Sequence, residues 1–160
     1  GTEASGTGNM KFALNGALTI GTWDGANIEI AQTVGDGNIF IFGLRAEDIA
    51  QRRALGYQPR LHVEENPRLA AVLEAVAGGL FSPEEPQRYR GLVDSLLNVD
   101  HYFVLADFAD YLAAQKRVDR AFADPQQWTR MTIHNIAAMG QFSSDRTVRE
   151  YARNIWNIAV

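Results

Sequence analysis

Two short apolar runs that flank one helical segment near the start of the chain limit the fold most. Residues 18–23 and 39–42 are predicted strands, and the second run is apolar on both faces, as in a strand buried within a parallel sheet. Residues 26–34 between them are predicted to form a short crossover helix, and residues 35–38 a turn. The sequence therefore predicts a compact βαβ unit, whose crossover is expected to be right-handed.

After residue 44 the sequence changes character and predicts helices. Nine of the fourteen glycines precede this point. Cap signals then occur at Asn66-Pro67, Ser82-Pro83-Glu84-Glu85, Asp124-Pro125 and Ser143-Ser144-Asp145. Apolar stripes at helical spacing are predicted to face inward at Leu69, Val72, Leu73 and Val76; at Tyr89, Leu92, Val93, Leu96 and Leu97; at Phe108, Tyr111, Leu112, Val118 and Phe122; at Trp128 and Met131; and at Val148, Tyr151, Ala152 and Ile155. Because two strands are too few for a stable open sheet, we expect the end piece of a larger α/β domain.

Composition excludes several classes of protein. The 160 residues are 46% apolar and 21% charged, which is typical of a globular chain of about one domain. No apolar run is long enough for a membrane span, and no signal peptide is visible. The net charge of −4 gives no basic face for nucleic acid, and the absence of cysteine excludes disulfides and thiolate chemistry. We expect a cytoplasmic protein.

The first fifteen residues carry the chemistry. Three glycines, two threonines and a serine occur among residues 1–8, which favours a loop whose amides can approach an anion. A helix is expected to open at Asn9, with Lys11 in its first turn and its N-terminal amides attracting phosphate. Lys11 could then be a phosphate counter-charge, or form a Schiff base with pyridoxal phosphate. The Walker spacing and the third glycine of a dinucleotide fingerprint are absent, so a bland glycine-rich turn is an equal alternative on spacing alone.

The complete string of residues 3–15 favours the second chemistry. It reads Glu3-Ala4-Ser5-Gly6-Thr7-Gly8-Asn9-Met10-Lys11-Phe12-Ala13-Leu14-Asn15. This string closely resembles the pyridoxal-phosphate attachment motif of the glycogen, starch and maltodextrin phosphorylases, and the chain resembles the bacterial-type members. The resemblance continues at residues 15–22, 24–29, 39–43, 106–108 and 142–147, so it spans almost the whole chain.

The resemblance implies a fold and a reaction. The expected fold is α/β: the C-terminal part of a Rossmann-like lobe of the two-lobed glycosyltransferase-B fold, with a short βαβ segment followed mainly by helices. Residues 1–44 would form the cofactor loop, helix and βαβ segment, and residues 45–160 the helical region of the same incomplete lobe. Family members use inorganic phosphate to cleave terminal α-1,4-glucosyl bonds, releasing α-D-glucose 1-phosphate with retention of configuration.

Site residues follow from the resemblance, residue by residue. Lys11 would be the catalytic residue in the sense that it holds pyridoxal 5'-phosphate covalently, and the amides of Gly6, Thr7 and Gly8 would bind phosphate. The glucose unit would be bound by Glu3, Ser5 and Gly6. The cofactor phosphate, with a second pKa near 6, would act as acid and base. No metal site is expected.

The remaining residues of the family's active site lie upstream of residue 1, so we expect the isolated chain to be inactive. Partners implied are the α-1,4-glucan, inorganic phosphate and the missing N-terminal part. The parent enzyme is expected to be a homodimer through that part, without nucleic acid or membrane. An alternative is a stand-alone, non-catalytic remnant that serves as a binding or interaction module. The intact attachment motif favours the phosphorylase fragment.

Other chemical residues are interpreted as structural. Lys116 is expected on a solvated helix face, and His62, His101 and His134 share no metal-ligand spacing. Asp24 and Glu29 are interpreted as support for the cofactor segment. The three tryptophans, Trp23, Trp128 and Trp156, are expected to anchor cores, and Ser143 to cap a helix.

Overall fold

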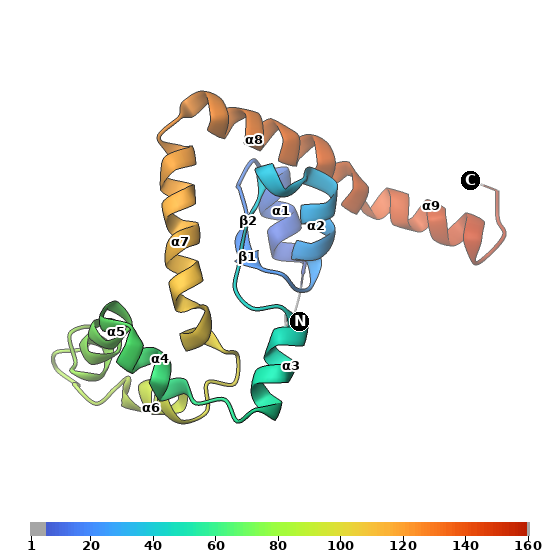
Figure 1. Cartoon of the computed structure of the whole chain (residues 1–160). Coiled ribbons are helices and arrows are strands. Elements are labelled where there is room, and N and C mark those ends of the chain that lie inside the picture. The colour runs from blue at the N-terminus through green and yellow to red at the C-terminus, as the bar shows by residue number, and fades with distance from the viewer. Residues whose placement is uncertain (1–5, 160) are drawn as a thin grey trace. The chain divides into compact units, whose positions relative to one another are not determined.

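The computed structural model describes residues 6–159, and these fall into two compact units (Figure 1). The first unit contains the described residues up to Ile41 and those from Lys116 onward, and the second contains Phe42–Gln115. The expected division at residue 44 concerns regions of one lobe in a whole enzyme, and it stays a prediction. Within this described part, no helix is both long and apolar enough to cross a membrane.

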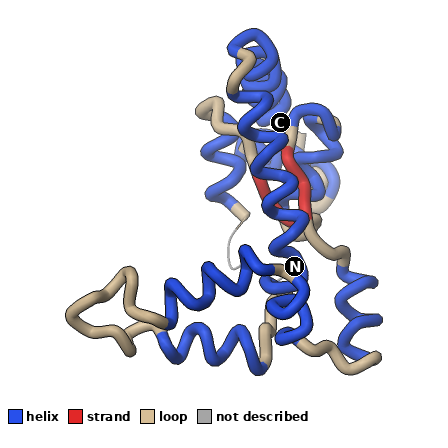
Figure 2. Tube along the Cα trace, turned by 60° about the vertical axis from the view of Figure 1, so that its left-hand side comes forward, coloured by secondary structure: helices blue, strands red, loops and turns tan. Residues whose placement is uncertain are grey.

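The first unit contains the predicted βαβ segment. Its elements are helix α1 (Thr7–Leu14), strand β1 (Ile20–Thr22), helix α2 (Ala26–Val34), the 3-10 turn η1 (Asp36–Asn38), strand β2 (Phe40–Phe42, whose last residue belongs to the second unit), the end of helix α7 (Val104–Phe122), helix α8 (Pro125–Ala138), the 3-10 turn η2 (Met139–Phe142) and helix α9 (Ser144–Asn154). The two strands form a two-stranded parallel sheet, and Figure 2 shows them in red. Each strand is only three residues long, shorter than the apolar runs that predicted them.

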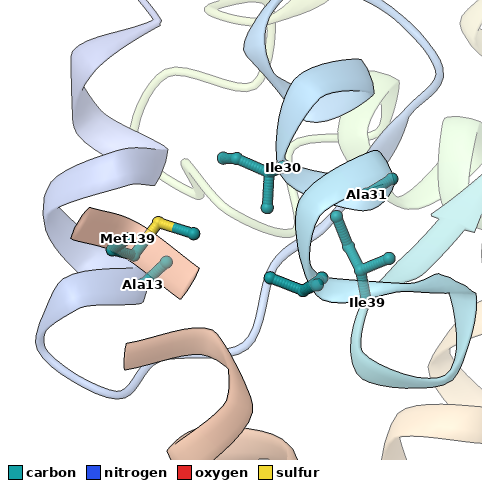
Figure 3. Close-up of a cluster of buried hydrophobic side chains, with 6 residues drawn as sticks. Ala13, Ile30, Ala31, Ile39 and Met139 are labelled. Atoms are coloured by element: carbon teal, nitrogen blue, oxygen red, sulfur yellow. The ribbon is translucent and has the colours of Figure 1, made fainter. Parts of the chain in front are cut away.

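Two apolar clusters hold the first unit together. Ala13 of α1, Ile30 and Ala31 of α2, Ile39 and Met139 share one cluster (Figure 3). The second cluster contains Phe40, Ala121 and Met131, with Trp128 and other half-buried side chains packed against it. Both clusters join residues about one hundred positions apart, so the C-terminal helices complete the core of the N-terminal segment.

The second unit is a small helical assembly. Its elements are helix α3 (Ala46–Ala54), helix α4 (Pro59–Glu65), helix α5 (Pro67–Ala77), helix α6 (Arg90–Asn98) and the beginning of α7. Its core contains Leu69, Leu73, Val93 and Leu105. The Asn66-Pro67 start is confirmed, because the Asn66 side chain accepts bonds from the amides of Arg68 and Leu69.

The capping box predicted at Ser82 is wrong. Residues 79–89 form turns, and the next helix begins only at Arg90. Pro86 explains the difference, because proline disfavours helical geometry in the residue before it and donates no amide hydrogen bond. The chain also folds closely here: a β-carbon on Gly79 would lie 2.7 Å from the α-carbon of Pro86.

Several predicted inward positions are exposed within residues 6–159. The stripes place Leu69, Leu73, Val93 and Met131 in the core, as expected. The exceptions are Val72, Leu92, Tyr111, Phe122, Val148, Tyr151, Ile155 and Trp156. In α9 only Ala152 is buried, so the predicted stripe of that helix has no cover among the described residues.

Candidate functional site

Lys11 lies in the second turn of α1, not in the first turn as predicted. The helix begins at Thr7, with Gly6 at the N-cap, two residues earlier than the expected start at Asn9. Gly6, Thr7 and Gly8 therefore occupy the first turn of the helix and its cap. Glu3 and Ser5, the two predicted sugar-binding side chains, lie outside the described residues.

The helix brings Lys11 and the glycine-rich segment onto one face. Gly8 and Thr7 precede Lys11 by three and four residues, which places all three on the same side of an α-helix. Long helical side chains generally point back toward the N-terminus, so we expect Lys11 to extend over the turn that contains Gly8. Gly6 at the N-cap has no side chain that could cap the helix, and among residues 6–159 no atom apart from its chain neighbours and the helix's own backbone lies within 4 Å of the place that a β-carbon on Gly8 would take.

This first turn has the properties of an anion site. The N-terminal amides of a helix point out of it and carry a partial positive charge. Lys11 adds a full positive charge one turn later, and no residue among 6–159 forms a salt bridge with it. The donor set of amides and one amine therefore suits a phosphorylated aldehyde, whose phosphate and carbonyl carbon need these two kinds of group.

A chain of polar contacts fixes α1 to the βαβ segment. The Asn9 side-chain amide donates to the Asn27 side-chain oxygen at 2.9 Å, which links α1 to α2. Asn27 in turn donates to the backbone oxygen of Thr22 at 3.0 Å, at the end of β1. The Thr22 hydroxyl contacts Asp24 at 3.2 Å. Sequence reasoning missed Asn27, because nothing in its spacing marks a contact with a residue eighteen positions earlier.

The other end of α1 is held by α8. The Thr132 hydroxyl donates to the Gly16 backbone oxygen at 3.2 Å. Asn135, fully buried on the same helix, donates to the backbone oxygen of Asn38 at 2.8 Å. The helix that carries Lys11 thus rests on elements from both ends of the chain.

The residues interpreted as structural have varied surroundings. Lys116, His101 and His134 are exposed, and within the described part of the chain no three His, Cys, Asp or Glu side chains are grouped to hold a metal. Asp24 lies in the turn before α2, whereas Glu29 is exposed on that helix, so the two carboxylates do not form a site. Trp23 and Trp128 pack against the two clusters, but Trp156 is 57% exposed, so the prediction that it anchors a core is wrong for residues 6–159.

In the second unit, carboxylates have structural partners. Buried Asp100 accepts from the Tyr57 hydroxyl at 2.7 Å and from the amides of Val104 and Leu105, at the start of α7. Burial and the Asp100 bond raise the pKa of Tyr57. Asp110 and Asp107 accept from the amides of Gly43 and Leu44 at 2.6 and 2.8 Å.

Comparison with known proteins gives one consistent family. The profile of the family described as carbohydrate phosphorylase matches residues 1–158. The human muscle form of glycogen phosphorylase is 49% identical over 158 residues, and the bovine brain form is 52% identical over 156 residues. These alignments cover 99% and 98% of this chain but only 19% and 18% of the relatives. The chain thus spans about a fifth of their length.

Proposed function

We propose that this chain, which belongs to the carbohydrate phosphorylase family, is part of an α-glucan phosphorylase that holds pyridoxal 5'-phosphate through Lys11. The observation that carries the proposal is the placement of Lys11 one helical turn after Gly8, with the glycine-rich segment Gly6–Gly8 at the N-terminus of the same helix. The family's glycosyltransferase-B fold, with a Rossmann-like lobe to which this α/β segment belongs, is part of the same proposal. The reaction proposed is phosphorolysis of terminal α-1,4-glucosyl units to α-D-glucose 1-phosphate.

Each residue has a distinct task in this proposal. Lys11 anchors the cofactor covalently, and the amides of Gly6, Thr7 and Gly8 bind phosphate oxygens at the positive end of α1. Glu3 and Ser5 bind the hydroxyls of the terminal glucose together with Gly6. When bound, the cofactor supplies a phosphate group that can donate and accept a proton near neutral pH.

Exposed apolar side chains support a larger parent protein. Phe12 and Leu14, which follow Lys11 on α1, are 69% and 55% exposed, and Val148 and Tyr151 of α9 are exposed as well. Large apolar patches of this kind usually meet another surface. We expect the rest of the enzyme to cover them. A cytoplasmic setting and a homodimeric parent remain predictions.

The experiment uses the product of the complete reading frame that contains this chain. We expect it to release glucose 1-phosphate from maltodextrin and inorganic phosphate, to lose this activity in Lys11→Ala, and to keep it in the matched control Lys116→Ala. Full activity of Lys11→Ala would overturn the assignment of Lys11. Absence of activity in the parent protein would favour the alternative of a non-catalytic binding module.

A further inference from the structure

We infer that Asn27 is a positioning residue, which sets the rotation of α1 and so the direction of Lys11. The inference rests on the proposed function of Lys11, because a direction matters only if the amine has a task. Asn27 itself lies on α2 and is half-buried. It acts through Asn9, two residues before Lys11 on α1.

Few side chains of α1 take part in its apolar packing. The helix has eight residues, and Ala13 is its only described residue that is fully buried. Met10 is partly buried and packs against the same cluster, whereas Phe12 and Leu14 are exposed. An alanine methyl group makes few contacts and has no direction, so a polar contact with defined geometry has more influence on the helix's setting.

Asn27 supplies such a contact because its own amide is fixed from two sides. Its nitrogen donates to the Thr22 oxygen while its oxygen accepts from Asn9, so both ends of the amide are engaged. Gly21 makes room for it: a β-carbon there would lie 2.5 Å from the Asn27 nitrogen. Gly21 of β1 and Asn27 of α2 therefore pack together in the arrangement that lets Asn27 reach α1.

The geometric consequence for Lys11 is large. A rotation of α1 by about 10° moves an atom at the roughly 5–6 Å radius of its side chains by about 1 Å. The end of a lysine side chain lies further out and moves more. Misplacement of about 1 Å is enough to impair a group that must meet a partner in a defined position. Loss of the Asn9–Asn27 bond should therefore reduce productive use of Lys11 without unfolding the unit.

The test measures Lys11 directly in the full 160-residue chain. Pyridoxal phosphate is added, the product is reduced with borohydride, and peptide mass mapping gives the ratio of label at Lys11 to label at Lys116. Amide hydrogen exchange of residues 7–14 reports on α1 independently of the cofactor. The variants are Asn27→Ala, Asn9→Ala and Gly21→Ala, the last of which displaces the Asn27 amide without replacing it.

Two matched control variants distinguish an effect on the position of α1 from a general loss of stability. Asn38→Ala removes a side-chain bond to the Val34 oxygen at the other end of α2, and Gly37→Ala adds a β-carbon where nothing lies within 4 Å. We expect each test variant to lower the Lys11 to Lys116 ratio about fivefold, the ratio that corresponds to one hydrogen bond of ordinary strength. Exchange in residues 7–14 should rise in the same variants and stay unchanged in both controls.

Each other outcome has a defined meaning. Faster exchange in α1 with an unchanged labelling ratio would make Asn27 a purely structural residue and overturn the inference. Unchanged exchange in α1 would overturn it as well. If the unsubstituted chain labels Lys11 and Lys116 equally, the cofactor site is not already formed within these 160 residues, whereas the exchange data still decide whether Asn27 sets α1. A double variant Asn9→Ala/Asn27→Ala should lose less than the sum of the two single losses, because both single variants remove the shared Asn9–Asn27 bond.

Discussion

Gly43 and Gly56 have nearly the same backbone conformation in different surroundings. Their φ angles are +84° and +82°, in the left-handed region that favours glycine. A β-carbon on Gly43 would lie 2.6 Å from the Asp107 carboxylate, whereas one on Gly56 would meet nothing within 4 Å. Residue 43 therefore needs a glycine for two reasons, and residue 56 for one.

Alanine substitutions at these two positions distinguish the cost of a left-handed backbone from the cost of a steric clash with Asp107. We expect Gly56→Ala to lower the free energy of unfolding by about 1 kcal/mol, the cost of a left-handed alanine. Gly43→Ala should cost about 3 kcal/mol, because it also displaces a buried carboxylate from its amide partner. Urea denaturation of both variants measures the difference. Equal decreases in the free energy of unfolding would show that the Asp107 side chain moves away from the new β-carbon without destabilising the fold.

At the scale of elements, helix starts depend on whether a cap side chain really bonds to the helix. Asp124 accepts from the amides of Gln126 and Gln127 at 3.0 and 3.1 Å, as its sequence predicts. Ser143 is at the N-cap position of α9, but its side chain makes no cap bond, which corrects the prediction that it caps this helix. A proline at the first helical position distinguishes the successful cases at Asn66 and Asp124.

This difference predicts unequal effects of removing the two caps. Asp124→Ala should lower the free energy of unfolding by about 1 kcal/mol, a usual value for a lost N-cap. Ser143→Ala should change it by less than about 0.5 kcal/mol, because no bond is lost. Thermal and urea unfolding followed by circular dichroism measures both. A Ser143→Ala loss as large as that of Asp124→Ala would contradict the geometry at α9.

The contact between α7 and the segment at Gly43 should depend on pH. Burial raises the pKa of Asp107 above its ordinary value of 3.8, and the charges of Asp110 and Asp100 add to this, although the Leu44 amide opposes it. The folded chain therefore takes up a proton at Asp107 at a higher pH than the unfolded chain does. The stability that Asp107 contributes is present below pH 3.8 and is lost as the pH rises through the folded-state value.

Asp107→Asn makes this contribution measurable. Compared with the variant, the unsubstituted chain should gain free energy of unfolding as the pH is lowered from about 7 toward about 4. Denaturant unfolding of both proteins across this range gives the difference at each pH. A difference that stays constant with pH, or that grows as the pH rises, would show that the pKa of Asp107 is not raised.

At the scale of the molecule, the sequence predicts local features better than it predicts packing. The βαβ segment, the capped helices and Lys11 are visible because they depend on neighbours a few positions away. The division into two units is not, because it depends on contacts such as Thr132 with Gly16, more than one hundred residues apart. The role inferred for Asn27 could not be predicted either, because it depends on a contact with Asn9, eighteen positions earlier. The predicted apolar stripe of α9 is mostly exposed, because periodicity indicates an apolar face but not the partner that covers it.

The chain by itself is expected to be inactive. It is about a fifth of the length of its relatives, and the family resemblance places the other phosphate and glucose ligands upstream. Incubation with maltodextrin, inorganic phosphate and pyridoxal phosphate should give no glucose 1-phosphate above a Lys11→Ala control. Release above that control would mean that these 160 residues contain a complete catalytic site.

The site at which the chain captures pyridoxal phosphate covalently tests the assignment of Lys11 most directly. After borohydride reduction, only Lys11, Lys116 and the N-terminal amine can carry the label, because the chain has no other lysine. We expect selective labelling of Lys11, suppressed by excess inorganic phosphate that competes for the amides of the first turn of α1. Equal labelling of all three amines, or selective labelling that phosphate does not affect, would contradict a cofactor site that is already formed on this helix within the 160 residues.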